Sequence, residues 1–62
     1  MKECVLFDKD GKEIDWFDPI ENDEDVIESE NVLTINHQNG NIYIIDGKNY
    51  SSYIVRELPE SR

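Results

Sequence analysis

The sequence predicts an all-β fold, a small antiparallel meander of five to six short strands that forms a compact barrel-like or sandwich sheet. Two observations predict it. Turn-forming residues recur at short intervals, and the runs between them are rich in the β-branched and aromatic residues that favour strands. With 62 residues the chain is near the lower limit for one hydrophobic core, so we expect residues 1–62 to be a single acidic β-domain.

The first predicted element is a hairpin with its turn at Asp8–Gly11. Cys4–Phe7 is a short apolar run, and Lys12–Phe17 alternates apolar with charged side chains, which is typical of a strand with one face in water. The Asp-x-Asp-Gly pattern of the turn also occurs in EF-hand calcium loops. The loop positions that need acidic ligands would fall on Leu6 and Phe17, so we interpret the segment as a hairpin turn.

A loop is predicted after the second strand. Asp18-Pro19 should end that strand, because proline cannot donate a ladder hydrogen bond and holds the preceding residue extended. Residues 20–25 are mostly acidic and should cross to the next hairpin. The alternative is a short helix over residues 19–31, with acidic residues in its first turn. Its few apolar residues form a poor stripe, which favours the loop.

The second predicted hairpin has the Asn39-Gly40 pair in its loop. This pair predicts a primed turn between strands at 32–36 and 41–46, since both residues tolerate positive φ. The preceding segment, Glu28–Asn31, reads as a tight turn.

The last predicted elements are a turn at Asp46–Asn49, a strand at Tyr50–Glu57, and a frayed tail from Pro59. Ile42–Ile45 and Tyr53–Val55 are unbroken runs of apolar and aromatic residues, whereas a strand with one face in water should alternate. Both faces of these strands therefore need a cover. We expect the first hairpin or a second copy of the chain to supply it, the latter giving a homo-oligomer.

The residue inventory argues against catalysis. Cys4 and His37 are the only cysteine and the only histidine, so the chain has neither an internal disulfide nor the ligand set of a zinc site. Cys4 suits the core, and His37 should be an exposed residue at a strand end. We therefore expect no enzyme activity, no cofactor and no metal. No apolar run resembles a signal peptide or membrane span, which predicts a cytoplasmic protein without membrane contact.

Charge is the most unusual feature of the sequence. The formal net charge is −9, and every charged residue from 13 to 46 is acidic. Such a field repels nucleic acid and anionic membranes and attracts basic surfaces. Adjacent strand residues point to opposite faces, which allows one of Trp16 and Phe17 to be an exposed interface anchor beside the acidic run; the alternative is burial of both, in the core or in a homodimer. The predicted partner-binding residues are Trp16, Asp18, Glu21, Asp23, Glu24, Asp25 and Glu28.

These observations together favour a non-enzymatic acidic protein-binding module. Carboxylates arranged like a phosphate backbone suit the basic, nucleic-acid-binding surface of a host enzyme or defence protein, and the composition is typical of small inhibitors from bacteriophages or mobile elements. One alternative is a structural or assembly protein that forms a homo-oligomer through its apolar strands. In that alternative the acidic face serves only solubility.

Overall fold

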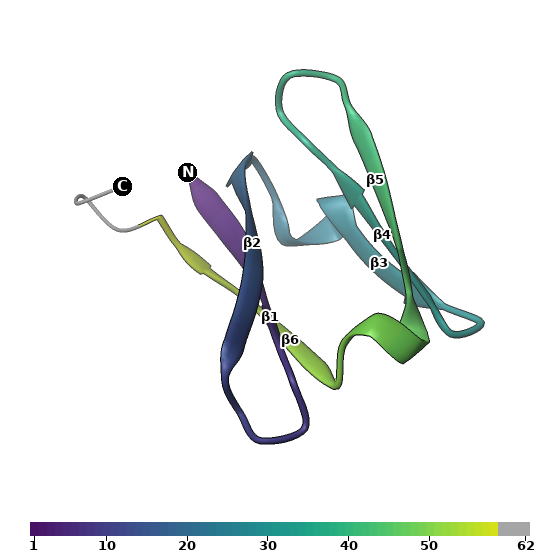
Figure 1. Cartoon of the computed structure of the whole chain (residues 1–62). Helices are drawn as coiled ribbons and strands as arrows, with labels where there is room; N and C mark the ends of the chain where they lie inside the picture. The colour runs from purple at the N-terminus through teal and green to yellow at the C-terminus, as the bar shows by residue number, and fades with distance from the viewer. Residues whose placement is uncertain (59–62) are drawn as a thin grey trace.

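The computed structural model describes residues 1–58, and over that range the chain has no α-helix. Six strands form two three-stranded antiparallel sheets that face each other (Figure 1). The predicted all-β class is confirmed, in its sandwich form, because the sheets do not join into a closed barrel. Pro59 and the predicted tail lie outside the described residues. The strands are β1 (Lys2–Phe7), β2 (Glu13–Ile20), β3 (Val26–Ser29), β4 (Val32–Asn36), β5 (Ile42–Asp46) and β6 (Ser52–Glu57).

The first sheet has the order β2-β1-β6, so the two strands nearest the chain ends are neighbours. Val5 in the central strand β1 lies opposite Trp16 in β2 and Ile54 in β6. Side chains from both neighbours therefore flank β1 on each face. This position explains why residues 3–6 are all buried although the sheet has one outward face.

The second sheet is a meander in the order β3-β4-β5. Leu33 and Ile35 of β4 point inward and are fully buried, while Thr34 between them lies on the outer face. Thr34 is flanked there by Ile27 of β3 and Ile44 of β5. The first hairpin thus covers one face of this sheet, as expected, and the other face carries exposed isoleucines.

The core lies between the sheets and draws on both of them. Its buried members are Cys4, Leu6, Ile20, Val26, Leu33 and Ile35. Phe17, three tyrosines, Ile45 and Val55 pack against them from the rim. Cys4 is a core residue, as the sequence predicts, and burial raises the pKa of its thiol to about 11. The thiol is therefore neutral and shielded at physiological pH.

The loop of the first hairpin is closed by hydrogen bonds around Asp8 and Gly11. Gly11 donates its N–H to the Asp8 carbonyl, and the Asp8 carboxylate accepts the N–H groups of Asp10 and Lys12 at 2.9 Å each. Gly11 has φ of 79°, which a glycine adopts without strain. The Asp8 carboxylate thus organises a turn, and residues 1–58 contain no group of three His, Cys, Asp or Glu side chains placed to hold a metal ion.

The geometry predicted for the Asn39-Gly40 turn is wrong in one respect. The hairpin exists, but only Gly40 has positive φ, in a loop closed by hydrogen bonds from Gly40 to His37 and from His37 to Asn41. This is a regular turn followed by a glycine bulge. The primed geometry occurs instead at Glu30 and Asn31, whose φ values are 51° and 66°. Two residues suffice there because β3 and β4 pair up to Ser29 and Val32.

Residues 21–25 connect the two sheets, which confirms the predicted crossing. The predicted end of the second strand at Asp18-Pro19 is wrong, because β2 continues through Pro19 to Ile20. Proline is tolerated there because β2 is an edge strand whose pairing with β1 shifts register at this point.

The connector at residues 21–25 contains a single 3-10 turn at Asp23–Asp25, and β3 begins at Val26, so the alternative helix over residues 19–31 is not formed. Asp25 stabilises this connector by accepting the N–H of Asn22 at 3.1 Å. No helix within the described range is both long and apolar enough to span a membrane.

Candidate protein-binding surface

The structure groups most of the predicted partner-binding residues around the end of β2. Trp16 and Asp18 lie in β2, and Glu21, Asp23, Glu24 and Asp25 follow directly in the connector. Glu28 is separated from them: it lies in β3, where its carboxylate accepts a hydrogen bond from the Tyr50 hydroxyl. Burial, with Glu28 as a second cause, raises the pKa of Tyr50 to about 12. Glu28 therefore links β3 to the connection between β5 and β6, whereas the acidic residues from Asp18 to Asp25 follow one another at the end of β2 and in the connector.

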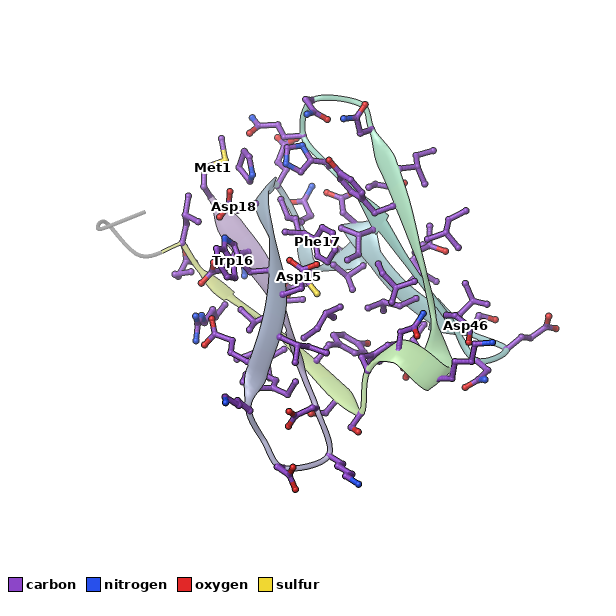
Figure 2. All side chains as sticks on the ribbon, in the orientation of Figure 1. Met1, Asp15, Trp16, Phe17, Asp18 and Asp46 are labelled. Carbon is purple, nitrogen blue, oxygen red and sulfur yellow. The ribbon has the colours of Figure 1, made fainter. Side chains whose placement is uncertain are left out.

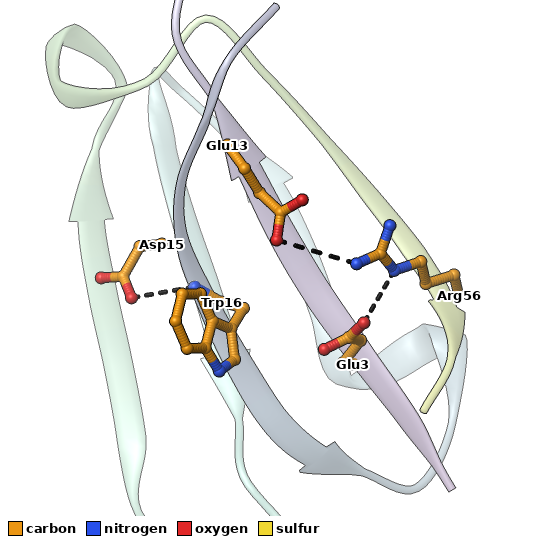
Figure 3. A network of polar contacts seen from close by, with 5 residues as sticks. All are labelled: Glu3, Glu13, Asp15, Trp16 and Arg56. Carbon is orange, nitrogen blue, oxygen red and sulfur yellow. Dashed lines mark hydrogen bonds and ion pairs between the residues drawn. The ribbon is translucent and has the colours of Figure 1, made fainter. Parts of the chain in front are cut away.

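Trp16 is the exposed member of the aromatic pair. Its side chain is 49% exposed on the outer face of the first sheet, while Phe17 packs against the core from the other face. Asp15 accepts the Trp16 N–H at 2.8 Å, an interaction drawn in Figure 3. This bond occupies a backbone donor at the free edge of β2, which protects the edge from pairing with another strand. The same outer face also exposes Ile54, on the far side of Val5.

A buried ion pair lies on the same outer face and was not predicted from the sequence. Glu3 is fully buried, and its carboxylate contacts Arg56 Nε at 2.7 Å (Figure 3). Arg56 Nη2 lies 3.8 Å from the exposed carboxylate of Glu13. Glu3 and Arg56 lie opposite each other in β1 and β6, and opposite charges at such positions indicate an ion pair. The sequence alone does not show that these two strands are neighbours.

A shallow hollow lies where β2 meets the loop between β4 and β5. It has a volume of about 250 Å³ and is lined by Trp16, Phe17, Asp18, His37 and Tyr43. The Phe17 and Tyr43 ring centroids are 5.1 Å apart, and His37 meets the Tyr43 ring edge-on at 5.8 Å. Contacts between the two sheets thus form its floor.

His37 holds this corner together, so its predicted exposure is wrong. Its side chain is half-buried, and its Nδ1 accepts the Asn39 N–H at 3.2 Å. An accepting Nδ1 carries no proton, which leaves Nε2 as the protonated nitrogen, and Nε2 donates to the Asp18 carbonyl. The next residue adds a second link, from the Gln38 N–H to the Pro19 carbonyl at 3.1 Å. Sequence proximity to the Asn39-Gly40 turn suggested exposure, but the sandwich places that turn against β2.

The connector is negative although one of its carboxylates is paired. Asp23 lies 3.0 Å from Lys2 Nζ, and this contact raises the pKa of Lys2. Glu21 and Glu24 are exposed to solvent. Lys9 and Lys48 line a separate depression together with Asp8, beside the Asp8–Gly11 turn and at the opposite end of the β1–β2 hairpin. The connector carboxylates and these two lysines therefore lie at opposite ends of that hairpin.

Neither protein-family models, nor curated proteins, nor solved structures gave a match to this chain. Any function must therefore be argued from the surface itself.

Proposed function

We propose that this chain is a non-catalytic binding module whose acidic connector and Trp16 occupy a basic surface on another protein. The observation that supports this proposal best is the position of the half-exposed Trp16 in β2, the strand that leads directly into the acidic connector. Lys9 and Lys48 lie at the far end of the hairpin. An exposed aromatic surrounded by charge is a common arrangement for an interface anchor with a polar rim.

The chemistry of the partner follows from the charge. A module of net charge −9 gains electrostatic attraction only from a cationic surface, and proteins that bind DNA or RNA present lysines and arginines spaced for phosphates. The module would compete with nucleic acid for such a surface and inhibit the partner stoichiometrically. This is how a bacteriophage or mobile-element protein would block a host enzyme or defence protein.

Affinity capture with competition tests this proposal. The chain is immobilised and exposed to bacterial lysate at low and at high salt, and each retained protein is purified and identified. We expect to retain a nucleic-acid-binding protein that is released by salt and by added duplex DNA or RNA. Nucleic acid should displace the chain because both bind the same lysines and arginines of the partner. A retained protein that neither salt nor nucleic acid displaces would contradict the proposal.

The outer face of the second sheet favours a second candidate, assembly with another copy of the chain. Ile42 and Ile44 are 63% and 72% exposed, and Ile27 lies beside Ile44 across Thr34. Residues 31–45 carry no charged side chain, so two copies with the same net charge repel least there.

Sedimentation equilibrium of wild type, Ile44→Lys and Ile54→Lys tests this second candidate. The two substitutions add the same charge at exposed isoleucines on opposite outer faces. Assembly through the second sheet predicts a dimer that only Ile44→Lys dissociates. A monomeric wild type, or equal dissociation by both variants, would contradict it.

A further inference from the structure

We propose that the hollow beside β2 receives the guanidinium group of an arginine from the partner protein. The inference rests on the proposed function and narrows it to one residue type on the partner and one pocket on this chain. Figure 2 shows the two aromatic residues of β2 on either side of the strand, Phe17 between the sheets and Trp16 on the outer side. The hollow spans the free edge of β2 and is lined by both of them.

The lining matches a cation. Trp16, Phe17 and Tyr43 supply aromatic rings, whose faces are electron-rich and attract cations within about 6 Å. Asp18, an acidic residue of the same strand as Trp16 and Phe17, also lines the hollow. The two ring nitrogens of His37 are engaged within the chain, with the Asn39 N–H and the Asp18 carbonyl. The lining residues include no lysine or arginine.

The size and shape favour a side chain over a free metabolite. Pockets for drug-sized ligands enclose roughly 300–1,000 Å³ and bury most of the ligand. This hollow has about 250 Å³ and is open to solvent, which suits the end of one long side chain reaching in from a flat protein surface. Arginine fits better than lysine, because its planar, weakly hydrated guanidinium stacks on aromatic faces while binding a carboxylate.

Trp16 is the only tryptophan in the chain, so its fluorescence reports directly on the hollow. The ¹⁵N-labelled protein is titrated with Nα-acetyl-arginine amide at constant ionic strength, with fluorescence and backbone amide shifts as readouts. Nα-acetyl-citrulline amide is the neutral probe of nearly the same shape. We expect saturable shifts at residues 16–18, 37 and 43 with the arginine probe, and at least tenfold weaker binding of the citrulline probe.

Two matched variants separate local from overall charge. Asp18→Asn removes the charge of an acidic residue that lines the hollow, and Asp10→Asn removes one from the distant hairpin turn, so each reduces the net negative charge by one. We expect about tenfold weaker arginine binding by Asp18→Asn and none of that loss by Asp10→Asn. Trp16→Leu, read by amide shifts alone, should weaken binding without unfolding the chain, because half of that side chain is exposed.

Equal binding of the arginine and citrulline probes, or equal effects of the two Asp→Asn substitutions, would overturn the inference. The proposed function is tested separately, by the capture experiment, because the acidic connector can bind a basic partner without the hollow. A captured partner whose binding tolerates Asp18→Asn would therefore refute the arginine pocket alone.

Discussion

Replacing Arg56 with methionine tests the buried ion pair of the first sheet. Methionine keeps much of the length and packing of the arginine stem but removes the cation that lies 2.7 Å from Glu3. Glu3 is fully buried, so its carboxylate would lose a cationic partner in a poorly solvated site. Removing one member of a buried pair costs about 3–5 kcal/mol. Arg56 is itself about one-third exposed, so we expect a smaller loss, about 2–3 kcal/mol.

That loss is a large share of what a domain of this length has, about 3–9 kcal/mol in total. Urea unfolding followed by far-UV circular dichroism measures it, with Glu13→Gln as the control, because Glu13 contacts the same guanidinium from an exposed position at 3.8 Å. The control should change the free energy of unfolding by less than about 0.5 kcal/mol. Restoring stability with Glu3→Leu in the Arg56→Met background would identify the buried negative charge of Glu3 as the cause. An Arg56→Met loss no larger than that of Glu13→Gln would refute the reasoning.

Three further substitutions test the core and the turns. Burial raises the pKa of Cys4 to about 11, above the roughly 8.5 of an unfolded thiol. The free energy of unfolding should therefore be unaffected by this thiol below about pH 8.5 and should fall as the pH rises through 11. Cys4→Ala should flatten this part of a pH series of urea unfolding curves. Gly47→Ala would place a Cβ 2.7 Å from the Asn31 carbonyl oxygen, which should cost about 1–3 kcal/mol in the same assay, unlike Ala at the exposed neighbour Lys48. Glu30→Asn should raise the unfolding free energy by about 0.5–1 kcal/mol because asparagine tolerates the φ of 51°, whereas Glu30→Gln, which removes the same charge, should not.

Local signals in the sequence were sufficient for the presence of the strands and the positions of the hairpin turns, but not for the end of β2, which continues through Pro19. Alternation and β-branched runs predicted the strands, and the glycines at 11 and 40 marked two hairpin loops, since each needs a backbone conformation that other residues adopt with strain. A tight turn was predicted at Glu28–Asn31, but its primed geometry was not, because Glu30 has no preference for positive φ. Its conformation is imposed by the pairing of β3 with β4, a contact that turn propensity does not encode.

The features that depend on strand order could not be predicted. Glu3 reads as one more surface acid until β6 is known to lie beside β1, which brings Arg56 opposite it. His37 reads as a loop residue until the corner of the sandwich places it against Asp18. Trp16 was the exception: adjacent strand residues must point to opposite faces, and the structure shows one of the pair exposed.

The most direct test of the acidic binding surface is a pair of charge reversals measured against a captured partner. Glu21→Lys with Glu24→Lys reverses exposed carboxylates in the connector and spares Asp23 and Asp25, which take part in local contacts. The matched control reverses two exposed acids away from the connector, at positions 10 and 30, so that both double variants have the same net charge. Association rates are measured as a function of ionic strength. The proposed surface predicts slower association and a shallower salt dependence for the connector variant only. Equal rates and salt slopes for the two double variants would contradict it.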